Sequence, residues 1–378
     1  FPSAYADTWT QKADYGGTSS NAQTGLSIGE KGYVWERSTK LFWEYDPAAD
    51  GWSQKTAFEG TIKSAAVGFS IDSKGYMGTG LNGSTCMTEF WEYDPSIDVN
   101  GTWTQKTDFT GNARYATVAF SIGSKGYIGT GYDNTSYKND FWEYDPAGDA
   151  WTQMADFGGV ARGYAVGFSI DSLGFIGTGS SSTLSEGTTY YKDFWEYDPA
   201  ENVWTQRADF GGPEREWAVG FAIDNKGYIG TGHAASGALK DFWEYDPGTD
   251  TWISKTAFGG DARYAAVAFV VGSKGYIGTG YNGSYLSNFW EYDPAGSVTP
   301  NAFTFTDQTG VALSTAYTSN TITVSGITTA ISITITGGTY SVNGGSYTGI
   351  AGTVSNGNTV TVKLTSSAAY STTTSATL

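Results

Sequence analysis

Apolar residues recur along the chain in short runs separated by Gly, Pro, Asp and Ser. The runs are rich in β-branched and aromatic residues, as in Ala265–Val271, and no segment shows helical periodicity over a useful length. In Phe42–Tyr45, alternate positions point to opposite faces of a strand, and both faces carry a bulky ring. The pattern predicts an all-β chain whose strands are covered on both faces.

One six-residue sequence, Phe-Trp-Glu-Tyr-Asp-Pro, organises most of the chain. Five of the six copies follow a glycine-rich run ending in Gly-Thr-Gly, and all but the last precede a Trp. Its proline ends a strand because it cannot donate to a ladder. The copies begin at Phe42, Phe90, Phe141, Phe194, Phe242 and Phe289. Four strand-like segments in a unit of about fifty residues predict the blade of a β-propeller.

The last repeat indicates how the ring closes. The copy at Phe289 is not followed by a Trp segment, whereas Asp7–Lys12, near the start of the chain, matches Asp250–Lys255. We therefore expect the N-terminus to supply the outermost strand of the sixth blade, which removes the open edge. This places a closed six-bladed propeller at residues 1–296.

These repeats resemble the kelch-repeat family over about residues 7 to 295. The resemblance rests on Gly227–Gly232, on Tyr245–Pro247 and on Trp252. The sequence departs from the family by having Gly-Thr-Gly where a kelch blade usually has adjacent glycines, and again at Val34–Arg37. The resemblance implies a six-bladed kelch-like β-propeller. It implies no single function, since kelch propellers serve as enzymes, sugar binders and protein binders.

A second domain is expected at residues 297–378. Its composition shifts to Thr, Ser, Gly and Val, with period-two runs such as Ile331–Ile335 and Thr359–Leu364. About seven short strands separated by Gly and Asn turns predict an immunoglobulin-like β-sandwich. It looks like the spacer modules of large bacterial surface proteins. Two interpretations stay open: a stabilising appendage, or a spacer in a longer adhesin-like polypeptide.

The charge of the chain excludes some partners. The net charge is −17, and Asp307 and Lys363 cancel in the tail, so the imbalance belongs to the propeller. A strongly acidic surface repels phosphate backbones, so we expect no nucleic-acid partner. No run approaches the roughly 20 apolar residues of a membrane span, so no membrane insertion is expected.

Cysteine use and the start of the chain bear on localisation. Cys86 is the only cysteine, which excludes an intramolecular disulfide. The abundance of Thr, Ser, Asn and Gly resembles bacterial secreted proteins that fold without disulfides. The chain begins at Phe1 without a targeting segment, which we interpret as a processed N-terminus. We expect an extracellular or cell-surface location.

Function is expected where the repeats differ. Carboxylates shared by all blades, such as Glu44 and Glu92, are best explained by the scaffold. The links from second to third strand and from fourth to first strand diverge, and they share one face of a propeller. Differing loops on a rigid scaffold are the usual seat of recognition.

Cations recur on that face, twelve residues before each Gly-aromatic pair. They are Lys63, Arg114, Arg162, Arg215 and Arg263, with Ser20 at this position in the first repeat. A propeller would gather them at the mouth of its channel as a site for a carboxylate-bearing sugar or an acidic peptide. The alternative is internal pairing with the acids Glu89, Asp140, Asp193 and Asp241, and the first repeat has Ser20 and Lys40 instead.

Aromatic residues also occupy the divergent loops. They are Tyr132, Tyr137, Tyr190, Tyr191, Trp217, Tyr281 and Tyr285. Exposed rings can stack on sugar faces or anchor a protein partner, and they can equally pack against neighbouring loops. The long insertion Ser180–Lys192 and the segment Glu214–Trp217 make the rim asymmetric.

Metal and cofactor chemistry finds little support. His233 is the only histidine, so a zinc site and a copper-oxidase cluster are not expected. The spacing around Asp133 and Asn134 matches no calcium loop. We predict no metal and no cofactor.

Three functions follow from these observations. The first is a secreted or cell-surface recognition module that binds a glycan or an extracellular protein. The second is a structural subunit or decoration of an extracellular assembly. The third is an enzyme, for which a six-bladed sugar mutarotase resembling the periplasmic sialic-acid enzymes would use Glu214, Arg215 and Glu216. The sequence favours recognition over catalysis.

Overall fold

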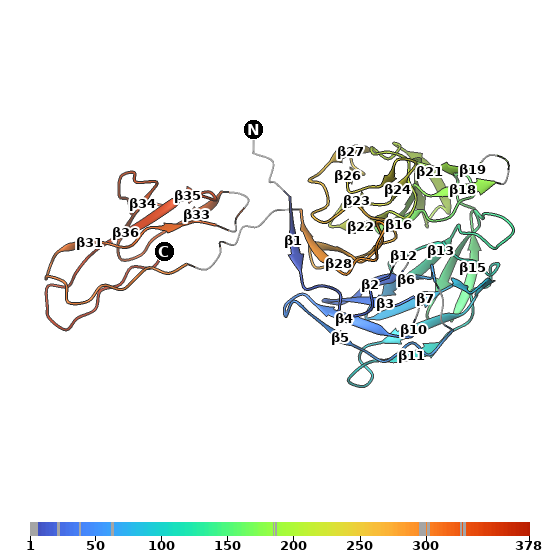
Figure 1. Ribbon diagram of the computed structural model, residues 1–378, viewed down its shortest axis with the longest axis horizontal. Helices are drawn as coiled ribbons and strands as arrows, with labels where there is room; N and C mark the ends of the chain where they lie inside the picture. Colours follow the sequence, from blue (N-terminus) through green and yellow to red (C-terminus); the bar gives the residue numbers. More distant parts are fainter. Residues whose placement is uncertain are drawn as a thin grey trace. The chain divides into compact units, whose positions relative to one another are not determined.

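The chain is built from β-strands throughout the part that the structure describes. The computed structural model describes residues 7–20, 23–37, 39–61, 64–183, 185, 187–294, 300, 303–325, 327 and 330–378. Within these ranges every regular element is a strand (Figure 1). Among these residues there is no helix of the length and apolarity that crossing a membrane requires. The all-β prediction is confirmed.

Six four-stranded antiparallel sheets make up the larger unit, Trp9–Tyr292 with Thr8 and Asp293 at the strand ends. We number these sheets as blades, each listed from its innermost strand. Blades one to three are β2 (Thr24–Ile28), β3 (Lys31–Trp35), β4 (Phe42–Asp46), β5 (Gly51–Gln54); β6 (Val67–Ile71), β7 (Lys74–Gly78), β10 (Phe90–Asp94), β11 (Thr102–Gln105); and β12 (Val118–Ile122), β13 (Lys125–Gly129), β14 (Phe141–Asp145), β15 (Ala150–Met154). Blades four to six are β16 (Val166–Ile170), β17 (Leu173–Gly177), β20 (Phe194–Asp198), β21 (Val203–Arg207); β22 (Val219–Ile223), β23 (Lys226–Gly230), β26 (Phe242–Asp246), β27 (Thr251–Ser254); and β28 (Val267–Val271), β29 (Lys274–Gly278), β30 (Phe289–Asp293), β1 (Thr8–Lys12).

The innermost strands form a closed ring. Strand β2 contacts β6, and the contacts continue through β12, β16, β22 and β28 back to β2. Figure 1 shows the sheets arranged around a common centre. This is the architecture of a β-propeller, in which each sheet is covered by its two neighbours.

Packing between blades explains the Gly-aromatic pair of each second strand. A Cβ built on Gly174 would lie 2.5 Å from the ring of Phe120 in the preceding blade. The absent side chain therefore leaves room for a neighbouring ring, and an alanine there would force the two sheets apart. In the repeated phrase, Phe141 and Tyr144 are fully buried. The buried aromatic rings of each blade thus form the core that packs against the neighbouring blade.

The shared carboxylates serve the scaffold. Glu92 accepts hydrogen bonds from Lys74 (2.6 Å) and from the hydroxyl of Tyr76 (2.8 Å), both on the adjacent strand. Asp145 accepts from the backbone nitrogen of Ala147 (3.0 Å) and so closes the turn after the third strand. These contacts agree with the structural role expected for the repeated acids.

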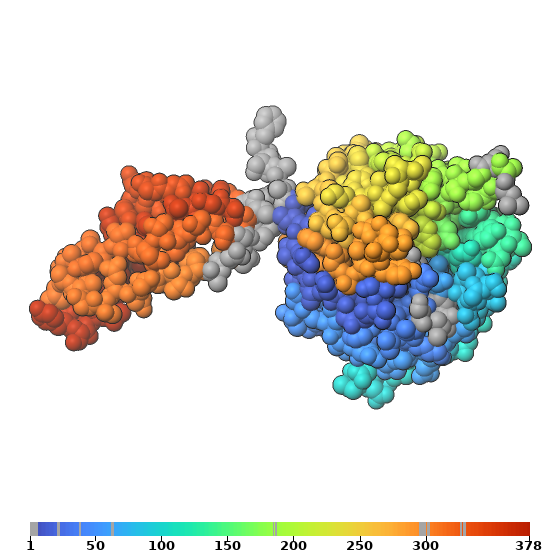
Figure 2. All heavy atoms as spheres, viewed as in Figure 1, coloured from blue at the N-terminus to red at the C-terminus, as the bar shows by residue number. Residues whose placement is uncertain are grey.

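Strand β1 pairs with β30 and completes blade six, as the match between Asp7–Lys12 and Asp250–Lys255 predicts. Its Trp9 lies 5.0 Å from the rings of Phe242 and Phe258 and 4.9 Å from that of Tyr292, between centroids. In Figure 2 the blue start of the described chain lies against the orange surface of blade six. The two ends of the propeller sequence therefore meet in one sheet.

The second unit contains Asp293–Leu378, and the predicted boundary at residues 296 and 297 lies outside the described residues. In one sheet β36 (Thr359–Thr365) pairs with β31 (Ala316–Thr318), β32 (Ile322–Thr323) and β34 (Thr339–Val342). In a second sheet β33 (Ile331–Ile333) pairs with β35 (Gly352–Val354). Ile322, Ile333, Tyr340, Val354 and Val360 form much of its core. The described residues thus hold six strands where the sequence predicts about seven.

Three short hairpins rise from the links between second and third strands. They are β8–β9 (Leu81–Asn82, Thr85–Cys86), β18–β19 (Ser180–Thr183, Gly187–Tyr190) and β24–β25 (His233–Ala234, Gly237–Ala238). These hairpins carry the divergent loops in which function is expected.

Candidate binding face of the propeller

The arginines of blades three to five are fully buried and paired with aspartates. In blade five Arg215 donates from Nη1 and Nη2 to the two carboxylate oxygens of Asp241, at 2.7 and 2.6 Å. Its Nε donates to Pro213 O (3.0 Å) and its Nη1 also to Thr231 O (2.7 Å). The guanidinium carbon lies 4.8 Å from the ring centroid of Phe210. Internal pairing, one of the two alternatives for these cations, is what the structure has.

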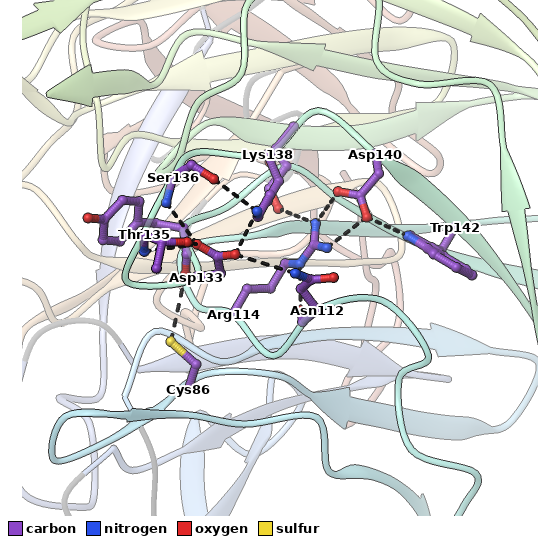
Figure 3. Close-up of polar contacts among 11 residues, drawn as sticks. Cys86, Asn112, Arg114, Asp133, Thr135, Ser136, Lys138, Asp140 and Trp142 are labelled. Carbon is purple, nitrogen blue, oxygen red and sulfur yellow. Dashed lines mark hydrogen bonds and ion pairs between the residues drawn. The ribbon is translucent and has the colours of Figure 1, made fainter. Parts of the chain in front are cut away.

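The same unit recurs in blades three and four. Figure 3 shows Arg114 facing the carboxylate of Asp140, to which Trp142 Nε1 also donates (2.8 Å). Arg162 and Asp193 make the equivalent pair at 2.6 and 2.8 Å. Burial acts to raise the pKa of these aspartates, but the hydrogen bonds from arginine and tryptophan and the charge of the arginine together hold the pKa below its ordinary value. We call this arrangement the Arg–Asp–Trp unit.

The Gly-Thr-Gly run positions each arginine. The carbonyl of Thr231 accepts from Arg215, and the nitrogen of Gly179, in the preceding blade, donates to Arg215 O (2.7 Å). Gly179 has a φ of +92°, and a Cβ there would lie 2.8 Å from Gly163 O. Only glycine fits this backbone. Each arginine is thus hydrogen-bonded to the Gly-Thr-Gly runs of its own blade and of the preceding blade.

The other blades depart from the unit. Lys63, at the arginine position of blade two, lies outside the described residues. In blade one the residue before Phe42 is Leu41, so Lys40 does not occupy the acid position, and its Nζ instead donates to Glu59 O (3.2 Å). The buried Glu36 supplies the carboxylate there and accepts from Trp43 Nε1 (3.2 Å). Blade six keeps Arg263 but has Asn288 before its phenylalanine.

The mouth of the channel is lined by small and aromatic residues. A cavity of about 110 Å³ lies there, and its described lining has no charged side chain. Its lining is Gln23, Ala65, Ala66, Val67, Ala116, Thr117, Tyr164, Ala165, Trp217, Ala218, Ala265 and Ala266. The expectation that the cations gather at this mouth is therefore wrong for the arginines.

A backbone ring explains why the arginines turn away from the mouth. The residue two positions after each arginine has a positive φ, such as +57° at Ala116 and +55° at Trp217. Its nitrogen donates to the matching carbonyl of the preceding blade, as from Trp217 to Tyr164 O (3.1 Å). This left-handed turn presents one residue per blade to the axis and directs the arginine back into the sheet.

Half-exposed rings cover the divergent loops of blades three to six. Tyr164 and Trp217 stack with centroids 4.0 Å apart. Further pairs are Tyr132 with Tyr137 (4.7 Å), Tyr281 with Tyr285 (5.2 Å), Tyr264 with Tyr281 (5.6 Å) and Tyr115 with Tyr164 (6.3 Å). We call these residues, together with Tyr190, the aromatic rim. Sequence reasoning missed Tyr115, Tyr164 and Tyr264, although the two positions after each arginine visibly differ between repeats.

Tyr191 has a different role from the rest of the predicted tyrosines. Its ring lies 4.2 Å from the guanidinium carbon of Arg162, and its hydroxyl is 2.7 Å from Ser181 Oγ. It therefore covers a buried cation and belongs to the scaffold of blade four. The neighbouring Tyr190 lies on the rim.

The carboxylate of Glu216 lies beside the rim residue Trp217. Glu216 accepts a hydrogen bond from Ser180 Oγ, and its backbone pairs with that of His233 in both directions. Burial raises the pKa of Glu216 above its ordinary value, against the hydrogen bond from Ser180 and the charge of His233. His233 Nδ1 lies 3.4 Å from the hydroxyl of Tyr190. Of the residues suggested for a mutarotase, Arg215 is paired internally, Glu214 is exposed and Glu216 alone is on the rim.

A second hollow lies at blades one and two. It has a volume of about 520 Å³ and is lined by both acidic and basic side chains. Its lining is Lys40, Glu59, Gly60, Thr61, Asn82, Glu89, Trp91 and Gln105. It holds one ring, Trp91, whereas the aromatic rim combines several.

The described residues contain no cluster of three side chains that could hold a metal ion. Asp133, once considered for calcium, accepts instead from Ser136 N (2.8 Å) and Lys138 Nζ (2.6 Å), as Figure 3 shows. The Cys86 thiol lies 3.9 Å from Tyr132 O, and burial raises its pKa. Neither group is set up for metal binding or nucleophilic attack.

Comparisons with known proteins add the fold alone. No protein-family model matches the chain, and no curated protein matches it. Among solved structures, 656 chains are similar, so the fold is widespread. The structure of YjhT is one of them, at 14% sequence identity and a TM-score of 0.62, over 74% of this chain and 95% of that one. The chain is thus an all-β protein with a propeller fold, and its function has to be argued from its site.

Proposed function

We propose that this protein is a kelch-like recognition module that binds a glycan through the aromatic rim. The observation that carries the proposal is the set of half-exposed rings on the loops that differ between blades. Partly exposed aromatic rings suit the apolar faces of sugars, on which they can stack. Because the arginines of blades three to five are buried and paired, the rim favours a neutral sugar over an acidic one.

The remaining parts of the chain fit an extracellular setting. We propose that the second unit is an immunoglobulin-like spacer that presents the propeller at a cell surface or in a larger extracellular polypeptide. The acidic composition and the single cysteine support this location. An extracellular protein partner or an assembly role is the competing use of the same face.

A glycan array tests the proposal, with the intact protein compared with variants. Tyr285, 53% exposed, and Trp217 at the channel mouth can be changed to Ala. Tyr370→Ala is the matched control, because this ring is 85% exposed and belongs to the second unit. We expect binding of neutral oligosaccharides that each rim variant weakens roughly 3- to 10-fold and that the control leaves unchanged. Equal binding by all four proteins would refute the rim as the site, and no binding by any would favour a protein partner.

A sugar mutarotase is the second candidate, and Glu216 is the observation that favours it. A carboxyl in this position is a candidate general acid or base, and burial raises the pKa of Glu216 above its ordinary value. The test follows anomer interconversion of neutral sugars by proton NMR. Acceleration that Glu216→Gln abolishes, with glycan binding retained, would support the enzyme, and no acceleration would exclude it.

A further inference from the structure

Blade six repeats the surroundings of the buried arginine but not its acid. Arg263 is fully buried, and its Nε and Nη1 donate to Asp261 O (3.1 Å) and Thr279 O (2.9 Å). Its guanidinium carbon lies 4.8 Å from the ring centroid of Phe258, as Arg215 does from that of Phe210. At the position of Asp241 stands Asn288, an amide without charge.

This change leaves hydrogen-bonding atoms without protein partners. Among the described residues, buried Arg263 Nη2, Trp290 Nε1 and Asn288 Oδ1 have none. In blade five, Arg215 Nη2 and Trp243 Nε1 both donate to one oxygen of Asp241, at 2.6 and 2.8 Å. The two donors that meet a carboxylate there are therefore both unused in blade six.

The two donors still surround one point. A Cβ built on Gly260 would lie 2.8 Å from Arg263 Nη2 and 2.9 Å from Trp290 Nε1. Both donors therefore lie beside Gly260, and contacts this short leave no room for a side chain at that position. Phe258 borders the same space, since its ring is also 2.8 Å from that Cβ position. Whatever binds there has to be small.

The charge of the site indicates its ligand. Burial lowers the pKa of Arg263 to about 10, so the guanidinium remains cationic at neutral pH. The charge of Asp261 acts on Arg263, but none of the described carboxylates hydrogen-bonds to the guanidinium. A buried cation of this kind is costly, and an anion that accepts from its free donors offsets that cost. The other three blades show which anion the geometry accepts, namely a carboxylate.

We propose that blade six binds a small monovalent anion, chloride or a formate-sized carboxylate, between Arg263 Nη2 and Trp290 Nε1. The anion accepts from the two donors that meet the aspartate carboxylate in blades three to five. This site is separate from the aromatic rim, and its occupant stabilises blade six rather than serving as the recognised glycan.

Thermal unfolding of the intact chain tests the proposal. The protein is heated in sodium chloride, in sodium formate and in sodium gluconate, whose anion is too large, at equal ionic strength. Above the dissociation constant we expect the Tm to rise by about 2 °C for each tenfold increase in chloride or formate. The comparison of chloride with formate identifies which small anion binds better.

Two single-residue variants control the experiment. Asn288→Asp supplies the missing carboxylate, so its Tm should be higher than that of the wild type and independent of the anion. Asp241→Asn builds the blade-six arrangement in blade five, so it should lower the Tm and enlarge the response to the anion. The rim variant Tyr285→Ala should respond as the wild type does, which separates this proposal from glycan binding.

Chloride-35 NMR gives a direct measurement of binding. We expect the wild type to broaden the chloride line beyond the broadening seen with Asn288→Asp, and formate to reverse that excess. Equal broadening and equal Tm responses in the two proteins would overturn the proposal. So would a Tm of the wild type that depends on ionic strength alone.

Discussion

Blades five and six differ in two respects although both contain the phrase Phe-Trp-Glu-Tyr-Asp-Pro. In blade five, Asp241 neutralises Arg215, whereas in blade six Asn288 leaves Arg263 without an acid. Blade five is also continuous in sequence, whereas blade six takes its outermost strand from β1 at the other end of the chain. Both differences lie outside the repeated letters.

The comparison teaches where the scaffold of this propeller can vary. Positions that pack against a neighbouring blade, such as Gly275 under Phe221, are retained in blade six. The acid of the Arg–Asp–Trp unit is not retained, since Asn288 replaces it, although Arg263 is as fully buried as Arg215. The residues that pack one sheet against the next are thus kept in both blades. The partner of the buried arginine, in contrast, differs between these two blades.

Removal of residues 1–13 should have the largest effect. It takes away the edge strand of blade six and the partly buried Trp9, so we expect a loss of about 5 kcal/mol, of which the truncation of Trp9 accounts for about 3 kcal/mol. Urea unfolding followed by tryptophan fluorescence measures it. Trp9→Ala and Trp252→Ala, at the equivalent position of blade five, should each cost a similar part of this amount. An unchanged unfolding midpoint after the deletion would mean that β1 does not close the ring.

Substitution of the buried arginines should have the next largest effect, and the loss of unfolding free energy should differ between blades five and six. Arg215→Met removes the cation from the carboxylate of Asp241, whose side chain is 30% exposed. Breaking a fully buried pair costs about 3–5 kcal/mol, so we expect a loss near the lower end of that range. Arg263→Met removes a cation that has no acid, so its cost should be clearly smaller. Urea unfolding of both variants in a buffer without small anions checks this order. Equal losses would show that hydrogen bonds to the backbone, and not the ion pair, decide the stability of the unit.

The smallest effect is expected from pH. The pKa of Asp241 is lowered in the folded state, so its contribution is present above the unfolded pKa of about 4 and is lost as the pH falls through the folded value. Asn288→Asp should add a contribution of the same kind, about 1.5–3 kcal/mol at pH 7. Unfolding midpoints of this variant and the wild type, measured between pH 3 and 7, should converge in acid. A constant difference across the range would contradict an ionised aspartate in blade six.

The sequence by itself determined the architecture of the propeller. The spacing of the six phrases predicted four strands per unit, and the Asp7–Lys12 match predicted the pairing of β1 with β30. Both predictions were possible because the repeated glycines and aromatic residues are the ones that pack neighbouring sheets together. The acids of the phrase were likewise predictable as scaffold, since they occur in every blade.

The tertiary structure alone decided what the divergent residues do. The sequence shows arginines twelve residues before the Gly-aromatic pair in four of the six repeats. It does not show that the left-handed residue two positions later turns them away from the channel. Tyr190 and Tyr191 are neighbours in sequence, and yet one lies on the rim and the other covers Arg162. The reason is physical, because the direction of the backbone at a turn and the packing of neighbouring blades decide which side chains of a loop face solvent. Both depend on residues that are far apart in the sequence.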